Sequence, residues 1–344
     1  MTHTKYIIAG AGLAGLTTAY QLLKKGEEDF IILEGRDRIG GRILTHDGVD
    51  LGATWFQQHH TQLSAIVDEL KVQKFRQYSI GKGVFIYSSM APPQYFDNGG
   101  NEAAAFRIGG GSIALIAALA KKVQEKIRLT NTITSITENE KGISVQTIND
   151  SFSAEKIVLA IPPKVAVQIR FEPTLPDTLI HAMSNTHTWM SNAIKVGITY
   201  SKAFWRDKNL SGTIVGHVGP TIELYDHSNQ TETTFSLMGF VNEGLRDEAA
   251  DNRKERILSY IEKHLGAEAR NYTHYYEKDW SMDPYTSNEK LKSMYISPQY
   301  GNPLFQDFYM NGKVLFSCAE TSALHGGYMD GAVISGIDAA SRLG

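Results

Sequence analysis

The sequence of 344 residues contains a single cysteine, Cys318. One thiol excludes an internal disulfide framework and any metal cluster that needs several thiolates, and it is typical of a reducing compartment. The sequence also lacks an apolar run long enough to span a membrane, and its first residues lack a signal-peptide pattern. We therefore expect a cytoplasmic protein that makes no use of a membrane.

Charge of one sign is not concentrated anywhere in the sequence. The 34 basic and 37 acidic residues give a formal net charge of −3 and form no long blocks. A nucleic-acid partner would call for a basic patch, so none is expected. The hydrophobic content of 42% and the length are those of a globular protein with one large domain or two interleaved ones.

The N-terminal segment has the pattern of a dinucleotide-binding turn. A buried parallel strand is predicted over 5–9, and a helix over 16–25 follows the glycine-rich sequence GAGLAG. In such a turn Gly10 permits the tight bend, Gly12 lets the backbone approach a pyrophosphate, and Gly15 lets the helix pack on the strand. The helix N-terminus adds partial positive charge. This pattern predicts a Rossmann-like α/β domain.

A second strand, predicted over 29–33, ends in Glu34, about twenty residues beyond the glycines. A carboxylate there accepts hydrogen bonds from both ribose hydroxyls and disfavours the 2′-phosphate of NADP. The glycine-bearing loop that follows ends in Arg42, whose charge suits a pyrophosphate. Alone, this loop would also be consistent with a surface turn rich in Gly and Arg.

Residues 33–42 (LEGRDRIGGR) resemble the second motif of the flavin amine oxidase family, which includes monoamine and polyamine oxidases. Residues 50–55 (DLGATW) resemble the family segment beneath the flavin. Residues 127–136 resemble the strand whose backbone holds the adenine, near Ile133. The most specific matches are FSCAET at 316–321 and GYMDGA at 327–332. The resemblance implies FAD, since the fingerprint is that of a dinucleotide.

The fingerprint and the resemblance together assign a set of residues to the binding of FAD. They are Gly10, Gly12, Ala14, Gly15, Glu34, Arg36, Gly41, Arg42, Gly52, Ala53, Thr54, Trp55, Ile133, Glu320, Gly327, Tyr328, Met329 and Ala332.

Lys195 is the first candidate for a catalytic role. In the stretch 191–205, alternation places Ile194 and Val196 on one strand face and Lys195 on the other. A lysine in that position is ordinarily on a solvated sheet face. The stretch also resembles the amine oxidase strand whose lysine holds a water against flavin N5 and is linked with reoxidation by oxygen. A cation there stabilises the negative charge that develops during electron transfer.

Two aromatic residues are further candidates. Trp280 ends a segment that resembles the family's Y-x-x-x-x-W element, which implies a wall of the site; ordinary burial of a large aromatic side chain is the alternative. Tyr328 matches one tyrosine of the pair that flanks the substrate nitrogen in monoamine oxidases. Relatives with a covalent flavin carry cysteine and tyrosine where this sequence has Glu289 and Lys290. The FAD is therefore expected to be non-covalent, and Cys318 to be a core residue.

The histidines give weaker indications. His59 and His60 follow the flavin-proximal segment, but no carboxylate or third histidine lies at ligand spacing, so we expect no metal. His325 precedes the GYMDGA segment, where contact with substrate and capping of the helix are both open. His217, His227 and His274 are interpreted as ordinary surface or packed residues.

The order of the motifs predicts two interleaved domains. FAD-binding segments at 1–75, 103–184 and 281–344 surround substrate-domain segments at 76–102 and 185–280. The second domain is expected to be α+β, with helices on one face of a mainly antiparallel sheet. Only 56 residues separate Gly52 from Gly109, where monoamine oxidases have a much larger insertion. The resemblance thus implies a shortened substrate domain.

The expected activity is oxidation of a small-molecule amine. Hydride would pass from the α-carbon to flavin N5, the imine would hydrolyse, and O2 would accept the electrons to give H2O2. Phytoene desaturases and protoporphyrinogen oxidases share the N-terminal fingerprint and act on carbon–carbon bonds, so an enzyme of that kind is an alternative. GDP dissociation inhibitors share the scaffold without redox chemistry; Glu34, Arg42 and the Glu320 motif argue against that reading.

Overall fold

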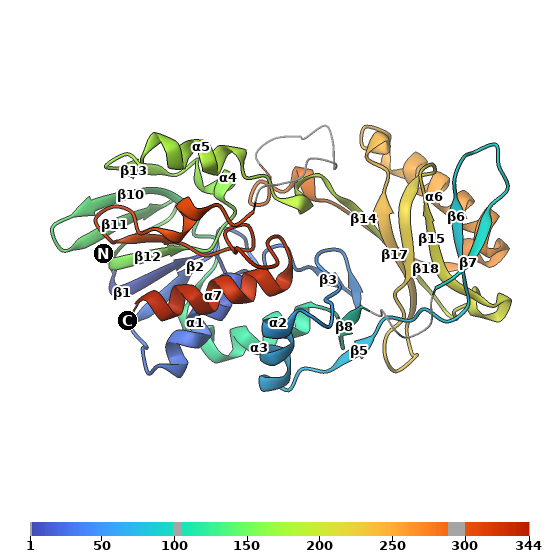
Figure 1. The fold of residues 1–344 in the computed structure, drawn as a ribbon, viewed down its shortest axis with the longest axis horizontal. Helices are drawn as coiled ribbons and strands as arrows, with labels where there is room; N and C mark the ends of the chain where they lie inside the picture. Colours follow the sequence, from blue (N-terminus) through green and yellow to red (C-terminus); the bar gives the residue numbers. More distant parts are fainter. Residues whose placement is uncertain (1, 99–104, 288–299, 344) are drawn as a thin grey trace.

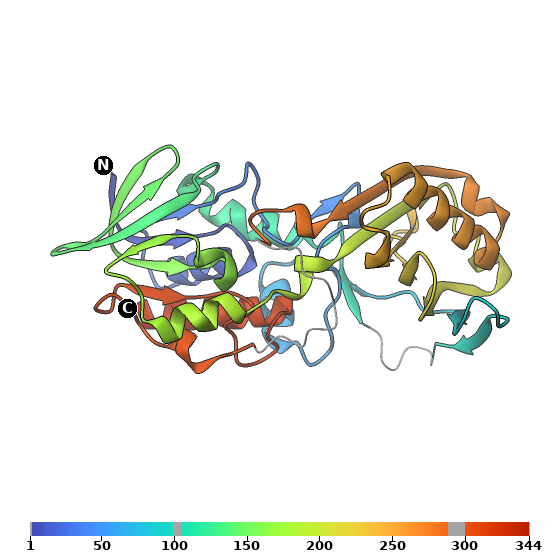
Figure 2. The same ribbon diagram turned by 90° about the horizontal axis from the view of Figure 1, so that it is seen from above.

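The computed structural model describes residues 2–98, 105–287 and 300–343. The chain forms two lobes along its longest axis, each built on one large β-sheet (Figures 1 and 2). Both ends of the chain lie in the lobe that contains β1 (Figure 1).

The first sheet has eight strands and contains the predicted dinucleotide-binding unit. The pairs β12–β1, β1–β2, β2–β9, β12–β19 and β10–β13 are parallel, whereas β11 pairs antiparallel with both β10 and β12. In spatial order the strands are β13 (Arg170–Glu172), β10 (Ile133–Asn139), β11 (Gly142–Thr147), β12 (Ser151–Leu159), β1 (Thr2–Ala9), β2 (Phe30–Leu33) and β9 (Ile127–Arg128), with β19 (Val314–Phe316) also on β12.

Alternating side chains of β1 supply two hydrophobic cores. Tyr6 and Ile8 pack on one face of the sheet, and Ile7 and Ala9 pack on the other. The first face is covered by α1 (Leu13–Lys24), α2 (Thr61–Glu69), α3 (Ile113–Val123) and α7 (Met329–Leu343). The second is covered by α4 (Pro163–Ala166) and α5 (Asp177–Asn185). This two-sided burial explains the near-continuous apolar sequence of the strand.

Gly10, Gly12 and Gly15, at the turn from β1 into α1, differ in why glycine stands there. Gly10 has a φ of +107°, and a Cβ there would lie 2.7 Å from the carbonyl oxygen of Ala160. A Cβ on Gly15 would clash with the carbonyl oxygen of Gly10, so the close approach of α1 to the turn requires glycine. At Gly12 the nearest atom to a Cβ would be 3.9 Å away. The fold therefore needs Gly10 and Gly15, while Gly12 leaves space.

The second sheet has seven strands and confirms the predicted α+β unit. All neighbouring strands pair antiparallel except β15 and β6. Helix α6 (Ala250–Leu265) packs its apolar residues on the sheet. In spatial order the strands are β18 (Tyr272–Asp279), β14 (Ile194–Tyr200), β17 (Phe235–Val241), β16 (Thr221–Asp226), β15 (Leu210–Gly216), β6 (Lys82–Ile86) and β7 (Gln94–Asp97).

Two small ribbons lie between the large sheets, β3 (Thr45–His46) with β4 (Val49–Asp50), and β5 (Lys74–Arg76) with β8 (Phe106–Ile108). The β3–β4 ribbon packs closely on the second sheet. A Cβ at Gly197 of β14 would clash with Val49 of this ribbon. As a result every residue of β14 is buried. The interpretation of Lys195 as part of a solvated sheet face is therefore wrong.

Several elements differ in detail from the predictions. The strand expected over 127–136 is two strands, β9 and β10, separated by a turn at 129–132 that includes Thr130 with a φ of +56°. Helix α1 begins at Leu13 rather than at residue 16, and the sequence did not predict β7 and β16. The strands of the second sheet lie within 82–97 and 194–279. The exact domain boundaries stay a prediction.

Candidate functional site

A cavity of about 360 Å³ lies at the carboxyl ends of β1 and β2, where α1 and α7 begin. This is the place where open parallel sheets bind their ligands. The predicted cofactor residues that line it are Gly10, Gly12, Ala14, Glu34, Arg36, Gly41, Arg42, Ala53, Ile133, Gly327, Tyr328, Met329 and Ala332. Residues that the sequence did not single out complete the wall, among them Asn131, Thr132, Pro162, Met190 and Tyr285.

The carboxylate of Glu34 is held in place at the end of β2. It is buried and accepts hydrogen bonds from the backbone N–H groups of Ala11, at 2.8 Å, and Arg36, at 2.9 Å. Arg36 in turn donates to Asp283 at 2.7 Å, and its guanidinium lies over the ring of Tyr285. A fixed carboxylate beside the glycine turn fits the ribose of a dinucleotide.

Arg42, which lines the cavity, forms an ion pair with the fully buried Glu320. Arg42 donates to both carboxylate oxygens of Glu320, with Nη2 at 2.9 Å from Oε2, and also donates to Thr188. Burial alone would raise the pKa of Glu320, but the charge and hydrogen bonds of Arg42 outweigh it and lower the pKa. Glu320 is not in the described part of the cavity wall, so it acts there through Arg42.

The N-terminus of α7 faces the same cavity. The cavity wall here consists of Gly327, Tyr328 and Met329. Tyr328 is 58% exposed. A helix N-terminus presents unpaired N–H groups and favours negative charge nearby. This arrangement suits the electron-rich end of a reduced flavin.

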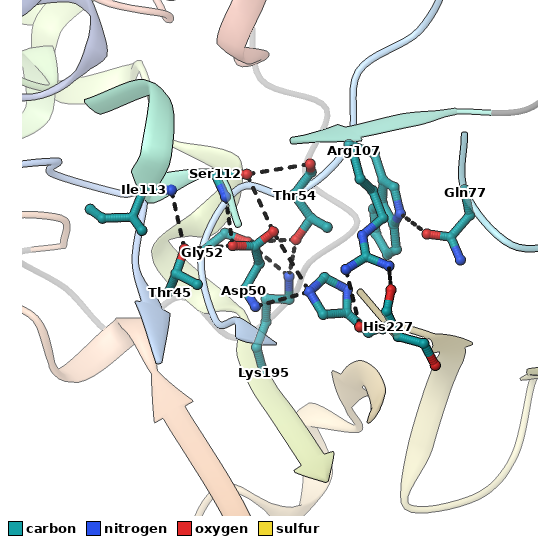
Figure 3. A network of polar contacts seen from close by, with 12 residues as sticks. Thr45, Asp50, Gly52, Thr54, Gln77, Arg107, Ser112, Ile113, Lys195 and His227 are labelled. Carbon is teal, nitrogen blue, oxygen red and sulfur yellow. Dashed lines mark hydrogen bonds and ion pairs between the residues drawn. The ribbon is translucent and has the colours of Figure 1, made fainter. Parts of the chain in front are cut away.

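Lys195 is buried next to Gly52 and Thr54 (Figure 3). Its Nζ donates to the carbonyl oxygen of Gly52 and to Oγ1 of Thr54, each at 2.8 Å. The ammonium also lies over the ring of Trp55, 5.6 Å from its centroid. Burial lowers the pKa of Lys195 to about 7. In the described structure Ala53 is the residue of this segment that lines the cavity. Its neighbours Gly52, Thr54 and Trp55 contact the lysine and position it.

A polar network around Asp50 supports this segment and was missed by the sequence analysis. The Asp50 carboxylate accepts hydrogen bonds from Thr45 Oγ1 at 2.6 Å and from Ser112 N–H at 2.9 Å (Figure 3). The backbone N–H of Asp50 donates to Nε2 of His227 at 3.1 Å, and Arg107 donates to the carbonyl oxygen of His227. The sequence signal that could have pointed to this network is the charged Asp50 in the largely apolar segment DLGATW.

Trp280 is fully buried and packs with Met190 and Phe240. Its Nε1–H donates to the carbonyl oxygen of Leu51 at 2.7 Å. Within the described residues Met190, and not Trp280, reaches the cavity wall. The structure therefore places Trp280 behind the flavin-proximal segment, and its role as a wall of the site stays a prediction.

Three histidines meet beside Tyr328. The ring of His60 lies 5.2 Å from that of Tyr328 and 4.8 Å from that of His325, and His59 contacts both histidines. Spacing in the sequence gave no third histidine for His59 and His60, but the fold brings His325 to them from the far end of the sequence, and the absence of a metal stays a prediction. Glu289 and Lys290 lie outside the described residues.

Comparisons with known proteins agree with this geometry. The sequence profile of the flavin containing amine oxidoreductases matches residues 13–89 and 75–344. The putrescine oxidase of Kocuria rosea is 25% identical over 98% of this chain and 94% of its own. A flavin-containing amine oxidase of Danio rerio is 30% identical over 71% of this chain and 47% of its own. A solved putrescine oxidase with putrescine bound has a TM-score of 0.86 at 22% identity, covering 98% of both chains.

Fold and cavity define a dinucleotide-binding flavoprotein with a second, sheet-based lobe. The chain belongs to the flavin-containing amine oxidoreductase family and is an FAD-dependent enzyme, which confirms the resemblance seen in its sequence. The alignment with the Kocuria protein extends over 457 positions although this chain has 344 residues, so the relative carries insertions. No helix among the described residues is long and apolar enough to cross a membrane.

Proposed function

We propose that this protein oxidises the carbon–nitrogen bond of a small amine to an imine, with O2 as electron acceptor and H2O2 as product. The observation that carries the proposal is the position of Lys195. Its ammonium is buried and bonded to Gly52 and Thr54, the residues on either side of the cavity-lining Ala53. FAD held in this cavity would supply the acceptor for a hydride from the amine α-carbon and the donor of electrons to O2.

The residues of the cavity fit FAD. The space above Gly12 admits a pyrophosphate, Glu34 suits a ribose, and Gly327 to Met329 bring the N-terminus of α7 to the cavity. Cys318 also lines the cavity, but burial raises the pKa of its thiol and disfavours the nucleophilic thiolate. We therefore infer that the cofactor is bound non-covalently.

Tyr328 is the residue assigned to the amine. The residue lines the cavity and is 58% exposed, which leaves its ring accessible to the α-carbon and nitrogen of a substrate. Lys195 is assigned to the reaction with oxygen, because a fixed cation stabilises the negative charge that O2 acquires. Relatives named for putrescine and for monoamines support a small diamine or monoamine as the substrate class.

The test is to purify the protein with added FAD, record its visible spectrum, and mix it without oxygen with primary, secondary and polyamine substrates. We expect one amine class to bleach the oxidised flavin band, and air to restore it with formation of H2O2. Flavin that binds but is reduced by no amine would overturn the proposal in favour of oxidation at carbon–carbon bonds.

A further inference from the structure

His325, His60 and His59 form a histidine cluster next to Tyr328, a residue of the cavity wall, and the buried carboxylate of Asp330 lies behind the cluster. His325 adopts a left-handed backbone conformation, with a φ of +50°, just before α7. Its Nδ1 lies 2.6 Å from Oδ2 of Asp330. The other oxygen of Asp330 accepts the backbone N–H of Leu63 in the first turn of α2, at 2.6 Å. Asp330 thus holds α2 and His325 together.

The hydrogen bonds define which nitrogen carries each proton. Because Nδ1 of His325 faces a carboxylate, that nitrogen is the donor and Nε2 is left as an acceptor. Nδ1 of His60 accepts the backbone N–H of Gln57 at 3.2 Å, so its Nε2 carries the proton. Burial lowers the pKa of His60 to about 4, which keeps this ring neutral at physiological pH. Nε2 of His325 is therefore the acceptor nitrogen of the cluster whose ring a carboxylate orients.

A metal ion fits this arrangement less well. The ring nitrogens of the cluster lie within 4.8 Å of one another, but Nδ1 of His60 and Nδ1 of His325 are already engaged in hydrogen bonds. A ligand bond from Nε2 of His60 would also require that nitrogen to lose its proton while Nδ1 remains an acceptor. An imidazole paired with a buried carboxylate is instead the arrangement that enzymes use for proton transfer.

We propose that His325, oriented by Asp330, is the base that removes a proton from the incoming substrate ammonium at the mouth of the cavity. The inference rests on the proposed amine oxidation. Amines are mostly protonated near pH 7, and only the neutral amine can give up a hydride. The cluster meets the cavity at Tyr328, through the ring of His60.

The proton balance is simple. R–CH2–NH3⁺ loses one proton to Nε2 of neutral His325, which leaves R–CH2–NH2 and an imidazolium beside the carboxylate of Asp330. Among the residues that the structure describes, the groups that face His325 are His59, His60 and Asp330, and Tyr328 contacts His60. His325 is half-buried and His59 is exposed, so the proton has a short way to solvent.

The experiment is to measure the anaerobic reduction rate of the FAD-loaded enzyme against pH, with the best amine of the panel, for wild type and His325→Asn. Asparagine can still donate to Asp330 but is not a base. Loss of a positioned base costs about 10²- to 10⁴-fold near pH 7. The rate of the variant should rise about tenfold per pH unit and approach wild type at high pH, where the amine arrives neutral.

A second variant and a control separate catalysis from folding. Asp330→Asn keeps the oxygen that caps α2 but cannot accept from His325, so it should show the same pH profile with a smaller loss. In the NMR spectrum of the FAD-free protein, the Nδ1 proton of His325 should be shifted far downfield and should lose that shift in Asp330→Asn. His181→Asn, which changes an exposed histidine bonded within its own helix α5, should match wild type.

The outcomes distinguish this inference from the proposed function. If wild type is reduced by an amine but His325→Asn has a parallel pH profile, the assignment of the base is wrong and the amine oxidation stands. If no amine reduces wild type, both fall. Stoichiometric Zn²⁺ binding to the FAD-free protein that is lost in His59→Asn would also overturn the assignment, because the cluster would then be a metal site.

Discussion

Nζ of Lys195 lies 2.8 Å from the carbonyl oxygen of Gly52, although the lysine belongs to β14 of the second sheet and the glycine follows β4. This bond ties the second lobe to the segment that lines the cofactor cavity through Ala53. The charge that we assign to the oxygen reaction is thus fixed by the contact between the lobes.

Replacing this charge should slow the reaction with oxygen. In Lys195→Met the ammonium is lost while a side chain of similar length fills the space, so reoxidation should fall at least about tenfold, because a lost charge interaction of 1.4 kcal/mol has that effect. Reduction by the amine should change much less. Stopped-flow measurement of the two half-reactions checks this, with the exposed Lys202→Met as control. Equal loss in both half-reactions would contradict the assignment.

The oxygen reaction should also depend on pH. Burial lowers the pKa of Lys195 to about 7, while the negative charge of Asp50 raises it. The ammonium therefore predominates below about pH 7, and reoxidation should slow as pH rises through that value. In Asp50→Asn the supporting charge is removed, so the inflection should move to lower pH. A profile that is flat in wild type, or unchanged in Asp50→Asn, would contradict the role of this charge.

Two glycine variants should distinguish an effect on FAD binding from an effect on the stability of the fold. Ala at position 12 meets no atom closer than 3.9 Å and Gly12 has a negative φ of −80°, so the FAD-free protein should keep its stability. The added methyl group occupies the space assigned to the pyrophosphate, and FAD affinity should fall at least about tenfold, or 1.4 kcal/mol.

Gly15→Ala is the matched variant, because its Cβ would clash with the carbonyl oxygen of Gly10. It should lose both stability and FAD. Thermal unfolding of the FAD-free proteins and fluorescence titration with FAD measure the two effects. Equal stability of both variants, or tight FAD binding by Gly12→Ala, would contradict the assignment of the space above Gly12 to the pyrophosphate.

The ion pair between Arg42 and Glu320 should contribute strongly to stability. Glu320→Gln leaves Arg42 without a charge partner, and removing one member of a buried pair costs about 3–5 kcal/mol. Because the Arg42 side chain is 20% exposed, we expect the lower end of this range. Urea unfolding without FAD measures it. The double variant Arg42→Met with Glu320→Leu should recover part of the lost unfolding free energy, because no unpaired charge remains. A double variant that is less stable than Glu320→Gln would show that the unpaired charge of Arg42 is not the cause of the loss.

The sequence predicted local features well and distant contacts poorly. Gly10, Gly15 and Glu34 were predictable because a turn, a close approach and a strand end each depend on neighbouring residues. The burial of Lys195 was not, since it depends on Val49 and Gly52, which lie far away in the chain.

The same limit applies to the polar contacts of the site. Asp50 and His227 are distant in sequence, as are His60 and His325, and spacing alone gave no sign that either pair would meet. The predicted pairing of Arg42 with a pyrophosphate also left out Glu320, because only the fold brings those two side chains together.

Trp280 provides a test between support and direct contact. Its indole donates to the carbonyl oxygen of Leu51, so Trp280→Phe leaves a buried acceptor unpaired and should cost about 1–3 kcal/mol of unfolding free energy. In the described structure the indole is not part of the cavity wall, so the relative kcat/KM values for different amines should stay unchanged.

Trp189→Phe, which changes an indole that is 44% exposed, serves as the control for Trp280→Phe and should leave stability nearly unchanged. Altered selectivity among amines in Trp280→Phe, with stability intact, would instead make Trp280 a wall of the substrate site. Because Leu51 lies two residues before Ala53, loss of the bond should also loosen the segment that Lys195 holds. In Trp280→Phe the reaction with oxygen should therefore slow while the selectivity among amines stays unchanged.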